Sequence, residues 1–111
     1  MYSVRFTRAA RAESIEAQDW YEREAAGLGR RFREAIDALT ARMSANPHQF
    51  PVVFKNVRRA LLRRFPYSLF FVIEDDILLV IAVSCKPRSV PLARANLRHC
   101  GIYTEDYGDS D

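Results

Sequence analysis

The sequence feature that most constrains the fold is a pair of apolar segments separated by three acidic residues. Residues 67–73 and 77–83 are dense in β-branched and aromatic side chains, which is typical of strands buried on both faces or nearly so. The acidic linker at residues 74–76 predicts a tight hairpin, because it is far too short for a crossover between parallel strands. The second half of the chain is therefore expected to form a mostly antiparallel sheet.

Two helical segments precede this hairpin. Residues 2–6 alternate and contain β-formers, so they predict a short strand, and Thr7 then fits the N-cap of a helix that runs to about Ala25. The next segment has a single apolar stripe at positions i, i+4, i+7, i+8, i+11 and i+15, which indicates a second helix. The stripe consists of Leu28, Phe32, Ala35, Ile36, Leu39 and Met43.

Glycine and proline mark the ends of these helices. Gly27 and Gly29 are expected to break the chain between the two helices, which makes an αα-hairpin. Asn46 precedes a proline and is therefore pushed out of the α region, so it ends the second helix. Residues 52–54 fit either the beginning of a strand or an extended approach to one.

Four arginines crowd the segment before the hairpin. Residues 57–65 alternate incompletely and neither face is purely apolar, as expected for a strand that is covered at one end and open at the other. Leu61, Leu62 and Phe65 are expected to reach the core beneath the helices, while the arginines extend from the edge and the open face. Pro66 cannot donate to a strand ladder, so it is expected at the corner before the hairpin.

The resulting order of elements is β-α-α-β-β-β. This is an α+β fold in which an N-terminal strand and an αα-hairpin precede a mostly antiparallel three-strand meander. A chain of 111 residues has the length of one domain, which we expect to span residues 1–103. Residues 104–111 form an acidic C-terminal tail that is expected to be solvated.

The basic residues concentrate in the middle of the chain. The net charge is only +3, but Asp37 and Glu74 are consecutive acidic residues in the sequence. The basic interval between them should attract an acidic partner or a polyanion, although arginines that are simply solvated on a strand face explain it equally well. The interval contains Arg42, Lys55, Arg58, Arg59, Arg63 and Arg64.

The composition also argues against several classes of protein. The longest apolar runs are far too short to cross a bilayer, and residues 1–11 contain no apolar stretch typical of a secretory signal, so we expect a cytoplasmic protein. Cys85 and Cys100 have the spacing of neither a disulfide framework nor a metal site. We expect them as small hydrophobic side chains in a reducing compartment. No metal or other cofactor is implied.

Six stretches follow one another in a recognisable order over about residues 2–94. They read VRFTRAA, DWYERE, GLGRRF, NPHQFP, VRRALLRRFPYSLFFVIEDDILLVIAV and KPR. In this order they resemble the RelE/ParE superfamily of toxins from bacterial type II toxin–antitoxin systems, and within it the ParE-like branch. The resemblance implies a toxin that a small, mostly disordered antitoxin holds inactive. It also implies a target, because RelE-like members cut mRNA on the ribosome whereas ParE-like members poison DNA gyrase.

The choice between these two activities depends on acid–base chemistry. Cleavage of RNA by its own 2′-hydroxyl needs a base, cationic stabilisation of the phosphorane and an acid. Cys85 stands where relatives often carry a histidine, and a thiol of ordinary pKa is a poor substitute near neutrality. His48 and His99 have no visible partner, while Tyr103 and Tyr107 lie in an acidic tail that would repel RNA.

We therefore expect a non-enzymatic inhibitor of DNA gyrase with no catalytic residues of its own. One alternative is a RelE-like, ribosome-dependent mRNA endonuclease. Another is a diverged member that binds its antitoxin and poisons nothing.

Two sets of residues are candidates for the two expected partners. The candidate surface for gyrase, DNA or both consists of Arg58, Arg59, Arg63, Arg64 and Arg88. A cognate ParD-like antitoxin, which the resemblance places in a hetero-oligomer with the toxin, would fold onto apolar side chains. The candidates for that contact are Leu28, Phe32, Phe50, Leu92, Leu97 and Ile102. The alternative for these six residues is that they complete the core of the chain itself.

Overall fold

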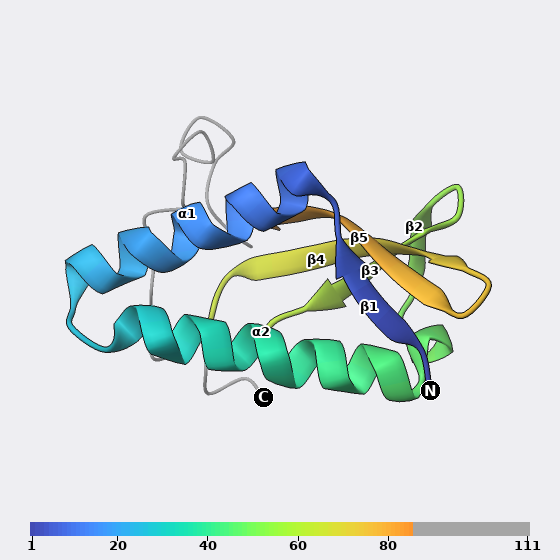
Figure 1. Ribbon diagram of the computed structural model, residues 1–111, viewed down its shortest axis with the longest axis horizontal. Coiled ribbons are helices and arrows are strands. Elements are labelled where there is room, and N and C mark those ends of the chain that lie inside the picture. The colour runs from blue at the N-terminus through green and yellow to red at the C-terminus, as the bar shows by residue number, and fades with distance from the viewer. Residues whose placement is uncertain (86–111) are drawn as a thin grey trace.

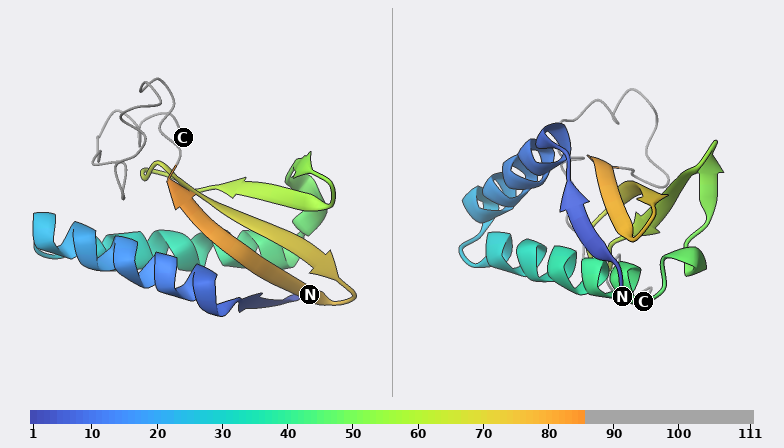
Figure 2. Two further views of the ribbon diagram at one scale, coloured as in Figure 1. Left: turned by 90° about the horizontal axis from the view of Figure 1, so that it is seen from above. Right: turned by 45° about the vertical axis from the view of Figure 1, so that its right-hand side comes forward.

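The chain forms one mixed sheet with two long helices against the same face of it (Figure 1). The computed structural model describes residues 1–85 of the 111, and within them five strands take the order β1-β5-β4-β3-β2. Turned views show the helix pair on one side of the sheet (Figure 2). The elements are β1 (Ser3–Phe6), α1 (Arg8–Glu24), α2 (Leu28–Ala45), the 3₁₀ helix η1 (Pro47–Gln49), β2 (Val52–Phe54), β3 (Val57–Leu61), β4 (Tyr67–Glu74) and β5 (Ile77–Cys85).

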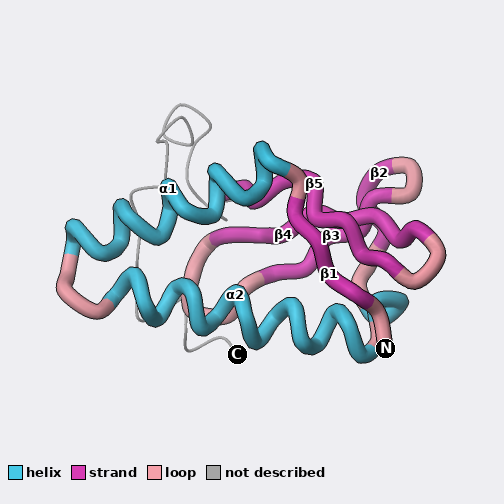
Figure 3. Tube along the Cα trace, in the orientation of Figure 1, coloured by secondary structure: helices cyan, strands magenta, loops and turns pink. Residues whose placement is uncertain are grey.

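The hairpin of β4 and β5 lies at the centre of the sheet, as the sequence predicts (Figure 3). The two strands pair antiparallel from Tyr67 opposite Cys85 to Glu74 opposite Ile77. Asp75 in the intervening turn has a positive φ of 57°, a conformation that short acidic side chains tolerate. β1 pairs with the other side of β5 and runs parallel to it, so the sheet is antiparallel except at this one edge.

Helix α1 begins at the predicted cap and buries a row of mostly small side chains. The Thr7 hydroxyl accepts a hydrogen bond from the Ala10 amide at 3.1 Å, which satisfies one N–H of the first turn. Ala10, Ala17 and Tyr21 are the buried residues of the helix. Trp20 packs edge-on against Tyr21 with 5.1 Å between the ring centroids.

The start of α2 depends on a side chain from α1. Gly27 has a φ of 89° and carries no side chain that could cap the helix. Glu22 supplies the cap instead, because its two carboxylate oxygens accept from the amides of Gly27 at 3.0 Å and Gly29 at 2.9 Å. The expectation that Gly29 breaks the chain is wrong: it lies inside α2. A Cβ there would come within 2.8 Å of the Gln18 carbonyl oxygen, so glycine permits the close approach of the helices.

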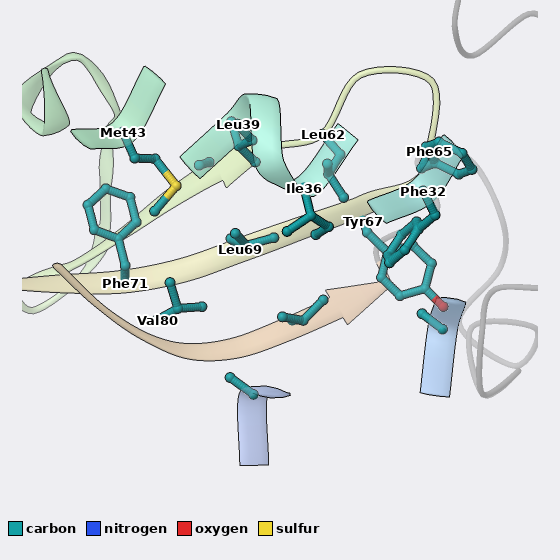
Figure 4. Close-up of a cluster of buried hydrophobic side chains, with 14 of the residues drawn as sticks. Phe32, Ile36, Leu39, Met43, Leu62, Phe65, Tyr67, Leu69, Phe71 and Val80 are labelled. Atoms are coloured by element: carbon teal, nitrogen blue, oxygen red, sulfur yellow. The ribbon is translucent and has the colours of Figure 1, made fainter. Parts of the chain in front are cut away.

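The apolar stripe of α2 packs onto the sheet as predicted (Figure 4). Phe32 lies in an aromatic cluster, with its ring centroid 5.4 Å from those of Tyr21 and Tyr67 and 5.2 Å from that of Phe65. Burial of each large apolar side chain contributes roughly 1.5–3 kcal/mol, so the stripe supplies much of what holds the helices on the sheet. Its buried members are Leu28, Phe32, Ile36, Leu39 and Met43.

Strand β3 is shorter than predicted and orients its leucines differently. Ala60 faces the helices and is completely buried, so the alternation of a strand turns Leu61 to the opposite face, where it is 44% exposed. The prediction that Leu61 reaches the core is therefore wrong. Leu62 and Phe65 do reach the core, but from the loop that follows the strand, and Pro66 ends this loop at the predicted corner.

A short fifth strand extends the predicted meander. β2 pairs antiparallel with β3 at Val52 opposite Arg58 and Phe54 opposite Val57, so residues 52–54 are a strand rather than an extended approach. Within residues 1–85, no helix combines the length and the apolarity that a membrane span requires. The predicted domain end at residue 103 and the acidic tail lie outside the described residues.

Candidate functional site

The arginines of the predicted basic surface lie in different surroundings, and Arg58 has a structural role. Its guanidinium donates a hydrogen bond to the Phe50 carbonyl oxygen at 2.7 Å in a partly buried position. This contact ties β3 to the segment that joins η1 to β2. Because the guanidinium is already engaged, Arg58 is less available to a partner than the sequence pattern suggests.

Three other arginines are more available to a partner than Arg58: Arg59, Arg63 and Arg64. Arg59 is half-buried and pairs across the sheet with Phe70, on the face of β3 that also carries Leu61. Arg63 and Arg64 are exposed in the loop between β3 and β4. Within the part of the chain that the structure describes, none of these three guanidinium groups makes a hydrogen bond or an ion pair. The cationic surface is therefore not neutralised by the carboxylates of the helices.

Arg63 and Arg64 line a pocket together with Arg31, which is not a member of the predicted basic surface. The pocket has a volume of about 380 Å³ and lies between α2 and the loop after β3. Arg31, Glu34 and Ala35 are spaced i, i+3, i+4 on the helix, and that spacing is the signal that groups them on one face. What the sequence could not show is that this face lies beside the loop. The lining residues are Arg31, Glu34, Ala35, Arg63, Arg64 and Phe65.

A second hollow lies at the tip of the helical hairpin. It has a volume of about 630 Å³ and carries both acidic and basic groups around Trp20, so its charge is mixed. Its lining residues are Trp20, Glu24, Ala25, Ala26, Gly27, Leu28, Arg30 and Arg31.

The apolar candidates for an antitoxin contact lie mostly inside the molecule or beyond the described residues. Leu28 is 8% exposed, Phe32 is fully buried and Phe50 is 7% exposed, and all three belong to the core. In the chain alone they therefore complete its own core. Leu92, Leu97 and Ile102 lie outside the described residues, and so does Arg88 of the basic set.

The groups that acid–base chemistry would require are poorly suited to it here. Burial, followed by the negative charge of Glu16, raises the pKa of Tyr67 far above its ordinary value, so the phenol stays protonated. Its hydroxyl has no hydrogen-bond partner in the described part of the molecule. His48 is exposed in η1. Cys85 is disulfide-bonded, which contradicts the expectation of a reduced thiol. No cluster of potential metal ligands exists among residues 1–85.

Comparison with known proteins agrees with this architecture. The family model described as the ParE toxin of the type II toxin-antitoxin system, parDE, matches residues 4–89. A chain of a solved structure described as the chromosomal ParDE TA system from P. aeruginosa superposes with a TM-score of 0.59 at 19% sequence identity. That match covers 78% of this chain and 98% of the other, and at this identity it establishes the shared fold alone. No curated protein matches the sequence.

Proposed function

Because the chain belongs to the ParE toxin family of type II toxin–antitoxin systems, we propose that it is a non-enzymatic inhibitor of DNA gyrase that a cognate antitoxin neutralises. It acts in the cytoplasm, where it docks on gyrase with its DNA and stabilises a state in which cleaved DNA is not resealed. The observation that carries the proposal is the set of three guanidinium groups that remain unpaired within the described residues, on Arg59, Arg63 and Arg64.

A gyrase inhibitor needs a charged docking surface but no acid or base of its own. Unpaired arginines attract acidic protein surfaces and DNA over a distance and accelerate association. Arg88 follows β5 in the sequence and is proposed as a further member of this surface. The buried, protonated Tyr67 and the disulfide-bonded Cys85 are poor sources of the acid and base that an mRNA endonuclease would require.

The antitoxin is proposed to cover apolar side chains of the toxin as it folds. Leu92, Leu97 and Ile102 remain the candidates for that contact in the C-terminal part of the chain. Leu28 and Phe50 pack in the core and expose only their edges to an antitoxin, whereas Phe32 is fully buried and out of reach in the chain alone. Coupled folding of this kind orders a disordered segment on a preformed surface.

The test is expression of the chain alone in bacteria, with two sets of readouts taken from the same cultures. We expect induction of the DNA damage response, loss of plasmid supercoiling and no early cleavage of mRNA, with growth restored by co-expression of the antitoxin. Cleavage of mRNA and arrest of translation with normal supercoiling would instead establish an endonuclease and refute the proposal.

Charge reversal identifies the residues involved. Replacement of Arg59, Arg63 and Arg64 by glutamate is expected to abolish toxicity, whereas Arg33→Glu on the exposed part of α2 is the matched control and should leave it intact. Arg58 is omitted from this set, because loss of its contact with the Phe50 carbonyl would weaken the fold as well as the surface.

A further inference from the structure

The pocket between α2 and the loop after β3, called the arginine pocket below, has the features of a built anion site. Its cationic groups come from two elements far apart in the sequence, Arg31 on the helix and Arg63 and Arg64 on the loop. Phe65, which is 2% exposed, and the half-buried Ala35 supply an apolar lining. Apolar surroundings weaken the screening by water and therefore strengthen the attraction of an anion.

The loop holds its two arginines in place by anchoring the residues on either side of them. Leu62 and Phe65 are buried, and Figure 4 shows both side chains reaching into the core, with Phe65 beside Phe32. The backbone is fixed as well, because the Leu62 amide donates to the Tyr67 carbonyl at 3.0 Å. The stretch between the two anchors therefore faces solvent, in a fixed position beside α2.

Arg64 occupies a backbone conformation that is unfavourable for its side chain. Its φ is 73°, in the left-handed region where glycine would be free of strain. A non-glycine residue in that region costs on the order of 1 kcal/mol. The chain thus carries a guanidinium at a position where backbone energetics alone would favour glycine.

The charges of the arginine pocket do not cancel. Three guanidinium groups and the carboxylate of Glu34 leave a formal charge of +2 (three minus one) among the residues that line it. None of these four side chains makes an ion pair with another described residue. The pocket therefore presents uncompensated donors around a volume of about 380 Å³.

We propose that the arginine pocket binds a phosphate group. The phosphate site goes beyond the proposed inhibition of gyrase and would exist whether or not the chain inhibits gyrase. A guanidinium presents paired N–H donors in a planar fork that matches phosphate oxygens, and a phosphate has enough oxygens to engage more than one such fork at once. A single carboxylate carries one negative charge on two oxygens, so it satisfies fewer of the three arginines. Binding involves no covalent step, and the phosphate belongs either to a nucleic acid backbone or to a free nucleotide.

The first experiment titrates the full-length protein with inorganic phosphate and follows backbone amide shifts by NMR. Shifts are expected in the loop at residues 62–66 and in the first turns of α2. Replacement of Arg31 by alanine should weaken binding about tenfold, the typical value of one charge-assisted hydrogen bond at an exposed site. Arg33→Ala, on the same helix outside the pocket, should leave the Kd unchanged. Equal weakening by both variants would mean diffuse attraction and would overturn the proposal.

Two further variants keep the test valid if an alanine substitution perturbs the fold. Arg64→Gly removes a guanidinium and relieves the positive φ, so it should weaken phosphate binding while the protein becomes no less stable. Glu34→Gln removes the one carboxylate among the described residues that line the arginine pocket and should tighten phosphate binding several-fold. Binding that is insensitive to both variants would show that the phosphate lies elsewhere.

The second experiment distinguishes the sources of the phosphate. The terminal phosphate of a nucleotide, which like a phosphate monoester gains its second charge with a pKa of about 6, should bind more tightly at pH 7.5 than at pH 5, whereas a phosphodiester keeps one charge throughout. A nucleic acid source predicts that a short DNA oligonucleotide competes with phosphate and that Arg31→Ala weakens its binding. A nucleotide source predicts competition by ADP and none by the oligonucleotide. An acidic peptide that binds the pocket while phosphate does not would refute the proposal.

These measurements separate the phosphate site from the proposed inhibition of gyrase. If phosphate binds in the arginine pocket but gyrase activity is unaffected, the proposed function fails while the phosphate site stands. If gyrase is inhibited by the Arg31→Ala variant as strongly as by the unmodified protein, and phosphate does not bind, the phosphate site fails alone.

Discussion

The contact most open to a quantitative test is the cap that Glu22 provides for the neighbouring helix. The N-cap residue of helix α2 is Gly27, which has no side chain to accept from the first-turn amides. Glu22 reaches across the hairpin and accepts from the amides of Gly27 at 3.0 Å and Gly29 at 2.9 Å. One side chain therefore both caps α2 and fixes its start against α1.

The expected cost of losing this cap follows from the two hydrogen bonds. Replacement of a capping side chain by alanine typically costs about 1 kcal/mol. Here two amides lose their acceptor, and the one at Gly29 is partly buried and poorly replaced by water, so Glu22→Ala should cost about 1–2 kcal/mol. Glu22→Gln keeps one acceptor oxygen and loses the charge near the helix N-terminus, so about half of that cost is expected.

The assay is urea unfolding followed by circular dichroism, with the m-value checked for constancy so that midpoints report stability. Glu24→Ala is the matched control, because Glu24 is an exposed residue of the same helix whose side chain makes no hydrogen bond with the described residues. Glu22→Ala should unfold at a clearly lower urea concentration than this control. Equal midpoints for the two variants would refute the capping role.

Three further substitutions test other parts of the fold. Tyr67→Phe should leave stability at neutral pH unchanged or raise it by up to about 1 kcal/mol, because it removes a buried hydroxyl without a partner. Burial raises the pKa of Tyr67 in the folded protein, so above pH 10 only the unfolded chain releases this proton. The free energy of unfolding should therefore decrease as the pH rises above 10, and it should decrease less in Tyr67→Phe than in the unmodified protein. Gly29→Ala places a Cβ 2.8 Å from the Gln18 carbonyl oxygen and should lower stability by about 1–3 kcal/mol, as measured by thermal unfolding. Unchanged stability would mean that the two helices can move apart without cost. The Val83 amide donates to the Glu13 carboxylate at 2.8 Å, and Glu13→Ala removes this acceptor, which should cost about 1 kcal/mol of stability. Glu13→Gln keeps an acceptor oxygen and should retain most of that stability. Equal losses of stability in the two variants would contradict this contact.

The elements specified by local sequence signals were predictable. The β4–β5 hairpin follows from two dense β-forming runs around a short acidic turn, and α2 follows from an apolar stripe at helical spacing. The cap at Thr7 needs only residues within one turn of it. In each case the structure is decided by neighbours in the sequence, which is why pattern and outcome agree.

The features that depend on distant parts of the chain were not predictable in the same way. The engagement of Arg58 by the Phe50 carbonyl requires β2 to pair with β3 in one register. The grouping of Arg31 with the arginines of the loop requires α2 to lie beside residues 62–66. Gly29 gives the signal of a helix break, and only the close approach of α1 shows why glycine is needed inside α2.

The proposed role of the unpaired arginines is tested most directly by a supercoiling assay in which the purified toxin is titrated against purified DNA gyrase. The unmodified chain and Arg33→Glu should inhibit supercoiling and accumulate cleaved DNA, while the triple replacement of Arg59, Arg63 and Arg64 by glutamate should do neither. Inhibition that survives the triple replacement, in a protein whose fold is intact by circular dichroism, would contradict the role of these unpaired arginines. Full gyrase activity at every concentration of the unmodified toxin would contradict the proposed target itself.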